Sequence, residues 1–468
     1  MAVTSPTVTS AAPSPVPAVA LGTVLAATIA QGMTGASVWL IPAGLALVLY
    51  LVAGWPGIRP VPRLLVAIGI AVVVAAMIRR GNAAPLPEAV ARASFFAAFP
   101  VAMTLLREAA VTSPLMLRAS RYLVNQPPGR RYWALTWGGH LIGLLLSFGA
   151  LTLLTTMIRQ SNTTTDARIR DIREKRMVTA VMRGFITMPL WSPTSIALIA
   201  ILQGTPSLHW IDVAPVGFAL AAAIIVLGWL VDRLQYRPRG VAPVEADPGP
   251  WTAVLGLAGL ILTLTVLCIA TAWLTGSSLQ LATMLVVPLF TLAWATAQAW
   301  TGPAAWRAAI GRSIGQIGGA ARASFPAGRN ETALFAASGL ISAGAVDLIP
   351  AGAAPWLVGL FAGHPGLFLV ALVWLVVALA LAGLTPMVTV ALFASALGQS
   401  PPPELDPIKL AVALAGGWAL SVGVAPLSNS VLLVAPLIQR TPIEVGPRWN
   451  GLFSALALVL LSLGLALF

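Results

Sequence analysis

The chain has 468 residues, of which 58% are hydrophobic and 9% are charged, and its mean hydropathy is +0.90. Soluble domains carry roughly 25% charged residues, so this composition excludes a soluble globular protein and indicates a polytopic membrane protein. The net charge of +13 comes mainly from arginines in short stretches between apolar segments. There they set the orientation of the spans, so no nucleic-acid partner is expected.

The sequence offers little for metal or disulfide chemistry. Cys268 is the single cysteine, which excludes a disulfide within the chain and a cysteine-based metal cluster. His140, His209 and His364 lack the spacing of metal ligands. We therefore expect no cofactor.

The first part of the chain predicts a tail and four membrane spans. Residues 1–16 are rich in Pro, Ser, Thr and Ala and contain no Lys or Arg, so they predict a disordered tail and not a signal peptide. Apolar segments long enough to cross a bilayer follow at 17–33, 37–54, 62–79 and 89–110. The first of these, assigned to residues 17–36, has no counterpart later in the chain and is treated as an extra span.

The next apolar stretch, 132–158, predicts a hairpin that enters and leaves the membrane on one side. Arginine-rich stretches flank it on both sides, and a simple crossing would place one of them outside the cell, against the positive-inside tendency. At ~1.5 Å per residue, two half-helices of about 13 residues each reach ~20 Å, which is enough to approach the midplane and return. The tip is predicted at Ser147-Phe148-Gly149.

The remaining segments lead to the end of the chain. Residues 236–250, rich in Pro, Gly and acidic residues, predict a linker between two halves. A fourth basic loop is predicted around Arg307, Arg312, Arg322 and Arg329. The further apolar segments lie at 178–202, 211–231, 251–275, 279–299, 331–350, 366–398, 409–437 and 450–467.

Orientation turns one of these segments into a second hairpin. With the amino terminus in the cytoplasm, most arginine-bearing loops lie inside only if 366–398 enters from the outer face and turns at Leu384-Thr385-Pro386. The fold class predicted is thus an all-α polytopic membrane protein with about eleven transmembrane helices and two opposed re-entrant hairpins.

The two halves predict an inverted-topology repeat. An offset of 237 residues carries Pro189-Leu190 onto Pro426-Leu427, and also carries the first hairpin tip onto the second. Repeat 1 covers 37–235, with three spans, the hairpin 132–158, the broken span 178–202 and the span 211–231. Repeat 2 covers 251–468, with three spans, the hairpin 366–398, the broken span 409–437 and the span 450–467. Inverted repeats with broken helices are typical of secondary transporters.

Proline breaks and hydroxyl groups mark the candidate binding site. Met188 to Ser195 and Gly423 to Val431 each interrupt an apolar segment with proline and hydroxyl-bearing residues. Irregular backbone at membrane depth is tolerated only inside protein or beside a cavity, and half-helix amino termini favour anions. A kink at a helix–helix contact is the alternative reading. The candidate substrate- and ion-binding residues are Ser147, Gly149, Ser192, Thr194, Ser195, Thr385, Ser428, Asn429 and Ser430.

Ionisable residues within the predicted spans are further candidates, because a charge inside the membrane is a functional candidate by default. Arg183, two turns before Pro189, could attract an anion, but snorkelling to the cytoplasmic face is favoured. Arg107, Glu108 and Asp347 are read as interfacial, and His140 as a hydrogen-bonded packing residue and not a proton relay. Their part in the function stays open.

The chain resembles the ion transporter superfamily in its order of spans and hairpins. The most specific likeness lies in two segments, Gly383-Leu384-Thr385-Pro386-Met387-Val388-Thr389 and Ala425-Pro426-Leu427-Ser428-Asn429-Ser430. The likeness is to the divalent-anion:sodium symporters and the arsenite-exporter-like proteins. Family members carry Ser-Asn-Thr signatures at the hairpin tips, whereas these tips read Ser-Phe-Gly and Leu-Thr-Pro. The resemblance implies a scaffold domain, a transport domain, elevator-like movement and commonly a homodimer.

The sequence therefore predicts a secondary active transporter of a small organic or inorganic anion, coupled to Na⁺ or H⁺, and not an enzyme. It would be a multi-pass protein of the bacterial inner membrane, surrounded by membrane lipid, with a cytoplasmic amino terminus. A proton-driven exporter, a channel or assembly subunit, and a membrane enzyme acting on lipid-linked substrates are the alternatives. The solute, the direction of transport and the coupling ion are left open.

Overall fold

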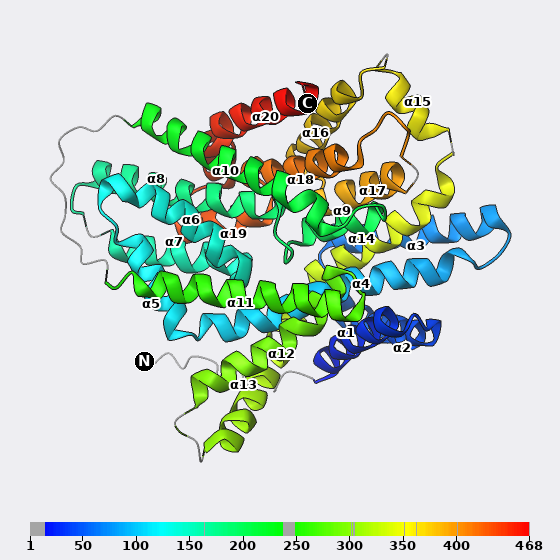
Figure 1. Cartoon of the computed structure of the whole chain (residues 1–468), viewed down its shortest axis with the longest axis horizontal. Coiled ribbons are helices and arrows are strands. Elements are labelled where there is room, and N and C mark those ends of the chain that lie inside the picture. The colour runs from blue at the N-terminus through cyan, green and yellow to red at the C-terminus, as the bar shows by residue number, and fades with distance from the viewer. Residues whose placement is uncertain are drawn as a thin grey trace, which may run out of the picture.

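The structure is a computed structural model that describes residues 15–162, 164–236, 249–300, 302, 305–350, 352–361, 363–399 and 401–467. Nearly all of the predicted tail and of the predicted linker lies outside these residues. The regular elements in the described part of the chain are helices (Figure 1). Ten helical stretches there are long and apolar enough to cross a membrane, which makes the chain a multi-pass membrane protein and confirms the predicted fold class.

The four predicted amino-terminal spans are present. They are α1 (Val16–Thr34), α2 (Leu40–Gly54), α3 (Pro60–Arg80) and α4 (Pro85–Val111). Prolines begin α3 and α4, where the missing N–H costs nothing. Past their last residues, α1 and α3 end in left-handed glycines, Gly35 and Gly81.

Two basic stretches form helices where no helix was predicted. α5 (Pro114–Val124) carries Arg118 and Arg121, and α13 (Trp306–Ala327) covers most of the predicted basic loop around Arg307 to Arg329. Both have one apolar face and several charged residues, so they contain no continuous apolar run that would reveal them as spans. The prediction of a loop around Arg307 to Arg322 is therefore wrong.

The first predicted hairpin is formed by α6 (Pro128–Leu146) and α7 (Gly149–Ser161). At the turn between them, Ser147 has a φ of 49°. The open ends of both arms lie beside the start of the next helix. In the first arm, the charge of Arg131 interacts with that of Arg173 in the next helix. After the second arm, the side-chain amide of Asn162 donates to the Arg170 oxygen at 2.9 Å. The chain therefore turns back at the predicted tip.

The following broken span is α8 (Ala167–Thr187), a short 3-10 turn at Met188–Leu190, and α9 (Ile196–Gly204); α10 (Trp210–Gln235) comes next. α8 begins about one-half of its length before the predicted start at 178. Asp166 caps it by accepting hydrogen bonds from the backbone N–H of Arg168 and Ile169, which extends the helix through charged residues.

The second half opens with two spans and the added helix. α11 (Thr252–Thr275) and α12 (Leu279–Ala299) precede α13, which runs beside α12 (Figure 1). α14 (Arg329–Leu348) follows and packs closely on α4, where a Cβ built at Gly339 would lie 2.6 Å from the Ala93 nitrogen. The short α15 (Ala353–Gly359) then leads to the second hairpin.

The second hairpin is formed by α16 (Pro365–Leu381) and α17 (Pro386–Gly398), which turn at Gly383 with a φ of 100°. Only glycine adopts this backbone conformation without strain. The chain then runs through the second broken span, α18 (Pro407–Val424) and α19 (Asn429–Leu437), a π-helical turn, and the last helix, α20 (Trp449–Leu467).

The two hairpins open toward opposite ends of the molecule. The last helix, α20, has one end near each hairpin opening. At its first residue, Trp449, the ring centre lies 5.9 Å from the ammonium of Lys175 in α8, near the open end of the first hairpin. At its other end, a Cβ built at Gly366, where the second hairpin begins, would lie 2.5 Å from the Leu465 oxygen.

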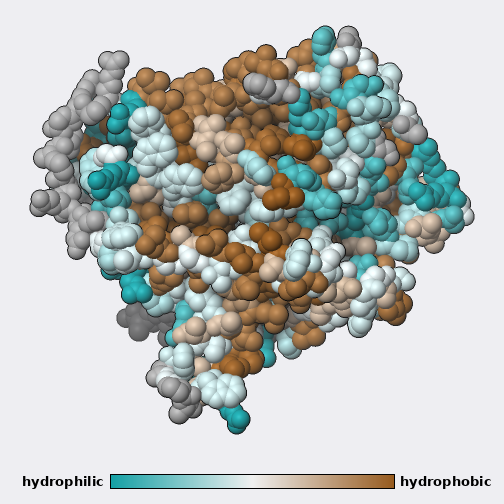
Figure 2. All heavy atoms as spheres, viewed as in Figure 1, coloured by the Kyte–Doolittle hydropathy of each residue, from teal (hydrophilic) through white to brown (hydrophobic). Residues whose placement is uncertain are grey.

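The core lies around α18, in which every residue from Leu410 to Val424 is buried. Hydrophobic side chains also cover much of the outside of the molecule, shown in brown in Figure 2. A buried central helix with an apolar outer surface is what a helix bundle in lipid requires.

Candidate functional site

The first break carries three of the predicted site residues. The hydroxyls of Ser192 and Thr194 share a hydrogen bond of 2.8 Å, and Thr194 also donates to the Leu144 oxygen at 3.3 Å, next to the first hairpin tip. Ser195 is buried and precedes the first residue of α9, with no side-chain cap bond. The break is therefore tied to the end of α6.

His140 supplies a second tie between hairpin and break. Its Nε2 accepts a hydrogen bond from the indole N–H of Trp191 at 3.0 Å. Its Nδ1 lies 3.0 Å from the Thr187 hydroxyl and 3.2 Å from the Gly184 oxygen. Because Nε2 accepts, the ring is neutral and its proton is on Nδ1.

The second break is built on serine hydroxyls. Ser428 caps α19, because its Oγ accepts from the Val431 N–H at 3.4 Å, and it donates to the Val422 oxygen at 2.8 Å. Ser430 also donates to the Val422 oxygen and lies 3.2 Å from Ser428. The carbonyl freed by the proline break thus finds two donors within the protein.

The hairpin tips lie against different neighbours. At the first tip, a Cβ built on Gly149 would lie 3.3 Å from the side chain of Arg107 on α4. At the second tip, the Thr385 hydroxyl caps α17 by accepting from the Met387 N–H, and a Cβ on Gly383 would lie 3.3 Å from Leu427 in the second break. The second tip therefore meets the break that follows it in the chain, whereas the first break reaches its hairpin at Leu144, three residues before the tip.

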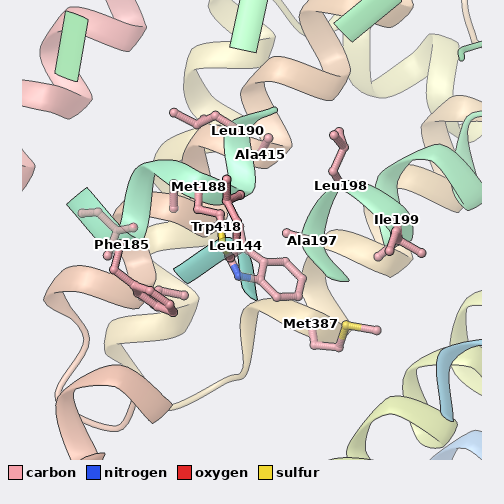
Figure 3. Packing of buried hydrophobic residues seen from close by; sticks show 14 of the residues in the cluster. Leu144, Phe185, Met188, Leu190, Ala197, Leu198, Ile199, Met387, Ala415 and Trp418 are labelled. Atoms are coloured by element: carbon pink, nitrogen blue, oxygen red, sulfur yellow. The ribbon is translucent and has the colours of Figure 1, made fainter. Parts of the chain in front are cut away.

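The two breaks approach each other through apolar side chains. A Cβ built on Gly423 would lie 2.9 Å from Ile186, just before the first break. Figure 3 shows Phe185, Met188 and Leu190 gathered near Ala415 and Trp418 of α18. In the described residues no hydrogen bond joins the hydroxyls of one break to those of the other, so the predicted residues form two separate polar clusters.

Asn429 differs from the other predicted residues of its break. Its side chain is exposed and makes no hydrogen bond with the described residues, whereas Ser428 and Ser430 beside it are buried. Leu427 is also exposed, to 63%. This edge of the second break, next to the second hairpin tip, is the open part of the candidate site.

Arg183 is buried, so the snorkelling prediction is wrong. The residue is 2% exposed, and its guanidinium donates to the Gly228 oxygen at 3.1 Å and lies 4.7 Å from the ring centre of Phe453. Longer contacts of 3.4 Å reach the Tyr132 hydroxyl and the Asn450 amide oxygen. Neutral oxygens and an aromatic face hold the charge inside the helix bundle.

Positive charge gathers at the open end of the first hairpin. Burial, together with the nearby charges of Arg173 and Arg176, lowers the pKa of Arg131 to about 10, so this arginine stays charged at neutral pH. Arg176 forms a two-bond ion pair with Asp232 at the end of α10, with distances of 3.1 and 2.7 Å.

The described residues contain no group of three His, Cys, Asp or Glu arranged for a metal ion.

Comparison with solved structures gives a distant likeness. No protein-family model matches the chain, and no curated protein matches its sequence. Among solved structures, the YdaH transporter of Alcanivorax borkumensis, described as having an unusual topology, superposes with a TM-score of 0.44 at 15% identity, over 78% of this chain and 84% of that chain. Because the superposition is this loose, the function proposed below rests on the chain's own geometry, and the resemblance to the ion transporter superfamily stays a prediction.

Proposed function

We propose that the protein is a secondary active transporter that moves a small anion across the bacterial inner membrane by alternating access. The observation that carries this proposal is the contact of each broken helix with the hairpin that precedes it, at Leu144 in the first hairpin and at Gly383 in the second, in two hairpins that open toward opposite ends. Irregular backbone of this kind at membrane depth is characteristic of transporter binding sites.

The directions of the helices favour an anion. Four helices begin at the tips and breaks, and their amino termini carry the positive ends of helix dipoles, each roughly +0.5 of an elementary charge. They are α7 at Gly149, α9 at Ile196, α17 at Pro386 and α19 at Asn429. An anion near these ends would need no buried arginine in contact with it.

The bounds of the helices support the inverted repeat as part of the same proposal. The predicted offset of 237 residues carries α7, 149–161, onto 386–398, which are the bounds of α17. It also carries the start of α6 at 128 onto the start of α16 at 365. Two copies of one unit in opposite orientations would supply the two-state exchange that alternating access needs.

The candidate residues would contribute differently to the solute site. Ser192, Thr194, Ser428 and Ser430 satisfy one another and nearby carbonyls, so they would shape the breaks. Asn429 lies at the open edge of the second break, next to the second tip, which contains Thr385, whereas the first-tip residue Gly149 lies against Arg107 on α4 and Ser147 is part of the same turn. An elevator-like movement of the hairpins and breaks against the remaining spans would expose this edge to either side.

Transport by the purified protein tests the proposal. The protein, reconstituted in vesicles, is screened by thermal shift against dicarboxylates, aromatic carboxylates and inorganic oxyanions, each with and without Na⁺, and uptake of any stabilising anion is then measured. Saturable uptake that responds to an imposed Na⁺ or H⁺ gradient supports the proposal and names the coupling ion. A pure H⁺ response with efflux would favour the proton-driven exporter, and conversion of a lipid-linked substrate without any flux would overturn transport altogether.

A further inference from the structure

An apolar groove separates α12 from α13, away from both breaks and both hairpin tips. Its volume is about 530 Å³. The lining residues are Leu289, Leu292, Ala293, Thr296, Ala297, Trp300, Trp306 and Ile310. The volume is within the usual range for small-molecule sites in proteins, ~300–1,000 Å³.

Two arginines stand at the end of this groove where α12 finishes. The Arg307 guanidinium lies 5.2 Å from the ring centre of Trp306, a lining residue. Arg312 donates to the Ala299 oxygen at 2.9 Å, one residue from the lining residue Trp300. Both arginines are exposed, so the groove joins an apolar interior to a cationic mouth.

Aromatic side chains place this mouth at the membrane surface. Trp300 and Trp306, which line the groove, are 56% and 52% exposed, and exposed tryptophans concentrate at the level of lipid headgroups. α13 is also held at the end of α4, where Gln316 donates to the Thr112 hydroxyl at 3.2 Å and Ser324 donates to Glu108 at 2.8 Å. By the positive-inside rule this end faces the cytoplasm.

One polar atom in the groove has no partner. The Thr296 hydroxyl is buried and makes no hydrogen bond with the described residues, although it lines the groove. A buried hydroxyl without a partner costs free energy.

We propose that the groove between α12 and α13 binds one anionic phospholipid, with an acyl chain along Leu289, Leu292 and Ile310 and its phosphate at Arg307 and Arg312. Phosphate suits the guanidinium fork, and a chain buried between the helices would fill the apolar volume. A second copy of the chain is the competing occupant. Charge disfavours it, because a symmetric dimer through this face would bring the arginines of both copies close together.

The test counts bound lipid on the full-length purified protein by native mass spectrometry, with phosphatidylglycerol and phosphatidylcholine as probes. Arg307→Gln/Arg312→Gln removes the charge at the mouth, Ala293→Phe fills the groove, and Arg118→Gln on α5 is the control that removes an exposed arginine elsewhere. We expect retention of one phosphatidylglycerol by the unchanged protein and by the control. In the double variant, preference for phosphatidylglycerol over phosphatidylcholine should fall about tenfold or more, and Ala293→Phe should lose retention of both lipids.

Two results would overturn the proposal. Equal retention of phosphatidylglycerol in the Ala293→Phe variant would mean that the lipid does not occupy the groove. Loss of a dimer in that variant, with lipid retention unchanged, would assign the groove to a second copy. Because Arg312→Gln also removes a bond to α12, Arg307→Gln alone is measured beside it, and the melting temperature without lipid shows whether either variant is folded.

Discussion

The indole N–H of Trp191 points at Nε2 of His140, at 3.0 Å, and the two rings are nearly parallel, at 20°, with their centres 5.8 Å apart. Trp191 belongs to the first break and His140 to the first arm of the first hairpin. This single contact therefore fixes the histidine's proton on Nδ1, toward Thr187 and the Gly184 oxygen, and holds hairpin and break together.

Trp191→Phe should keep an aromatic ring at this position but remove the donor. The buried Nε2 would then have no partner, and leaving a buried polar atom unpaired costs about 1–3 kcal/mol. We expect the variant to have a lower melting temperature than the unchanged protein. We also expect its backbone hydrogen exchange to speed up more in α6 than in α16. Trp39→Phe, at an exposed tryptophan, is the matched control, and equal melting of both variants would show that the bond does not stabilise the hairpin.

Close contact between α6 and α8 depends on two glycines. A Cβ built on Gly184 would lie 1.8 Å from the Thr136 oxygen, and one on Gly139 would lie 2.3 Å from the Val181 oxygen. Since both obstacles are backbone atoms, an added methyl group must push the helices apart. Overpacking typically costs about 1–3 kcal/mol and sometimes more.

We therefore expect Gly184→Ala to reduce the yield of monodisperse protein and to lower its melting temperature. Gly259→Ala on α11 is the control, because nothing lies within 4 Å of a Cβ there. Wild-type yield and melting of Gly184→Ala would contradict the close helix contact.

Arg183 is expected to hold four elements together. Its guanidinium reaches the Gly228 oxygen on α10, Tyr132 on α6 and Asn450 on α20, all from α8. Arg183→Lys keeps the positive charge, but an ammonium lacks the planar guanidinium with its several N–H groups. We therefore expect it to lose the hydrogen bonds to these three partners.

We expect this variant to be destabilised by about 1.5–3 kcal/mol, the range for hydrogen bonds that involve a charged group. Tyr132→Phe removes only one contact of 3.4 Å and should cost less. The two are compared by denaturant unfolding in detergent. An equal loss in both would mean that the contact with Tyr132 accounts for the whole effect and that the contacts with Gly228 and Asn450 add nothing.

The hairpins could be predicted from the sequence because orientation constrains them. Arginines on both sides of 132–158 leave no consistent crossing, and the structure has the turn at Ser147. α5 and α13 could not be found in the same way, since their apolar residues are interrupted by arginines and only tertiary contacts, such as Ser324 to Glu108, hold them. The burial of Arg183 was missed for the same reason: its partners Gly228 and Asn450 come from distant parts of the chain.

The sequence predicts the two helix breaks of the candidate site, but not which partners their side chains bond to. Proline and serine indicate a break, and both breaks are present. Which hydroxyls bond to protein depends on distances that spacing does not give. Thr194 reaches the Leu144 oxygen and Ser430 the Val422 oxygen, while Asn429 stays exposed.

Asn429 and Ser430 are neighbours that should respond in opposite ways to substitution. Asn429 is exposed and bonds to no described residue, so Asn429→Ala should leave the melting temperature unchanged. If the amide contacts the anion, the same variant should lose most solute uptake in vesicles and most of the solute-dependent thermal shift. Ser430→Ala removes a buried hydroxyl that donates to the Val422 oxygen and should cost about 0.5–1.5 kcal/mol of stability.

The pair separates a binding role from a structural one. An Asn429→Ala protein that melts normally and transports normally would exclude the amide from the solute site, whatever the fate of the transport proposal. An Asn429→Ala protein that melts early would show that Asn429 supports the fold, in which case loss of uptake would carry no information about binding. Only normal melting of Asn429→Ala with lost uptake, beside early melting of Ser430→Ala, agrees with solute binding at the open edge of the second break.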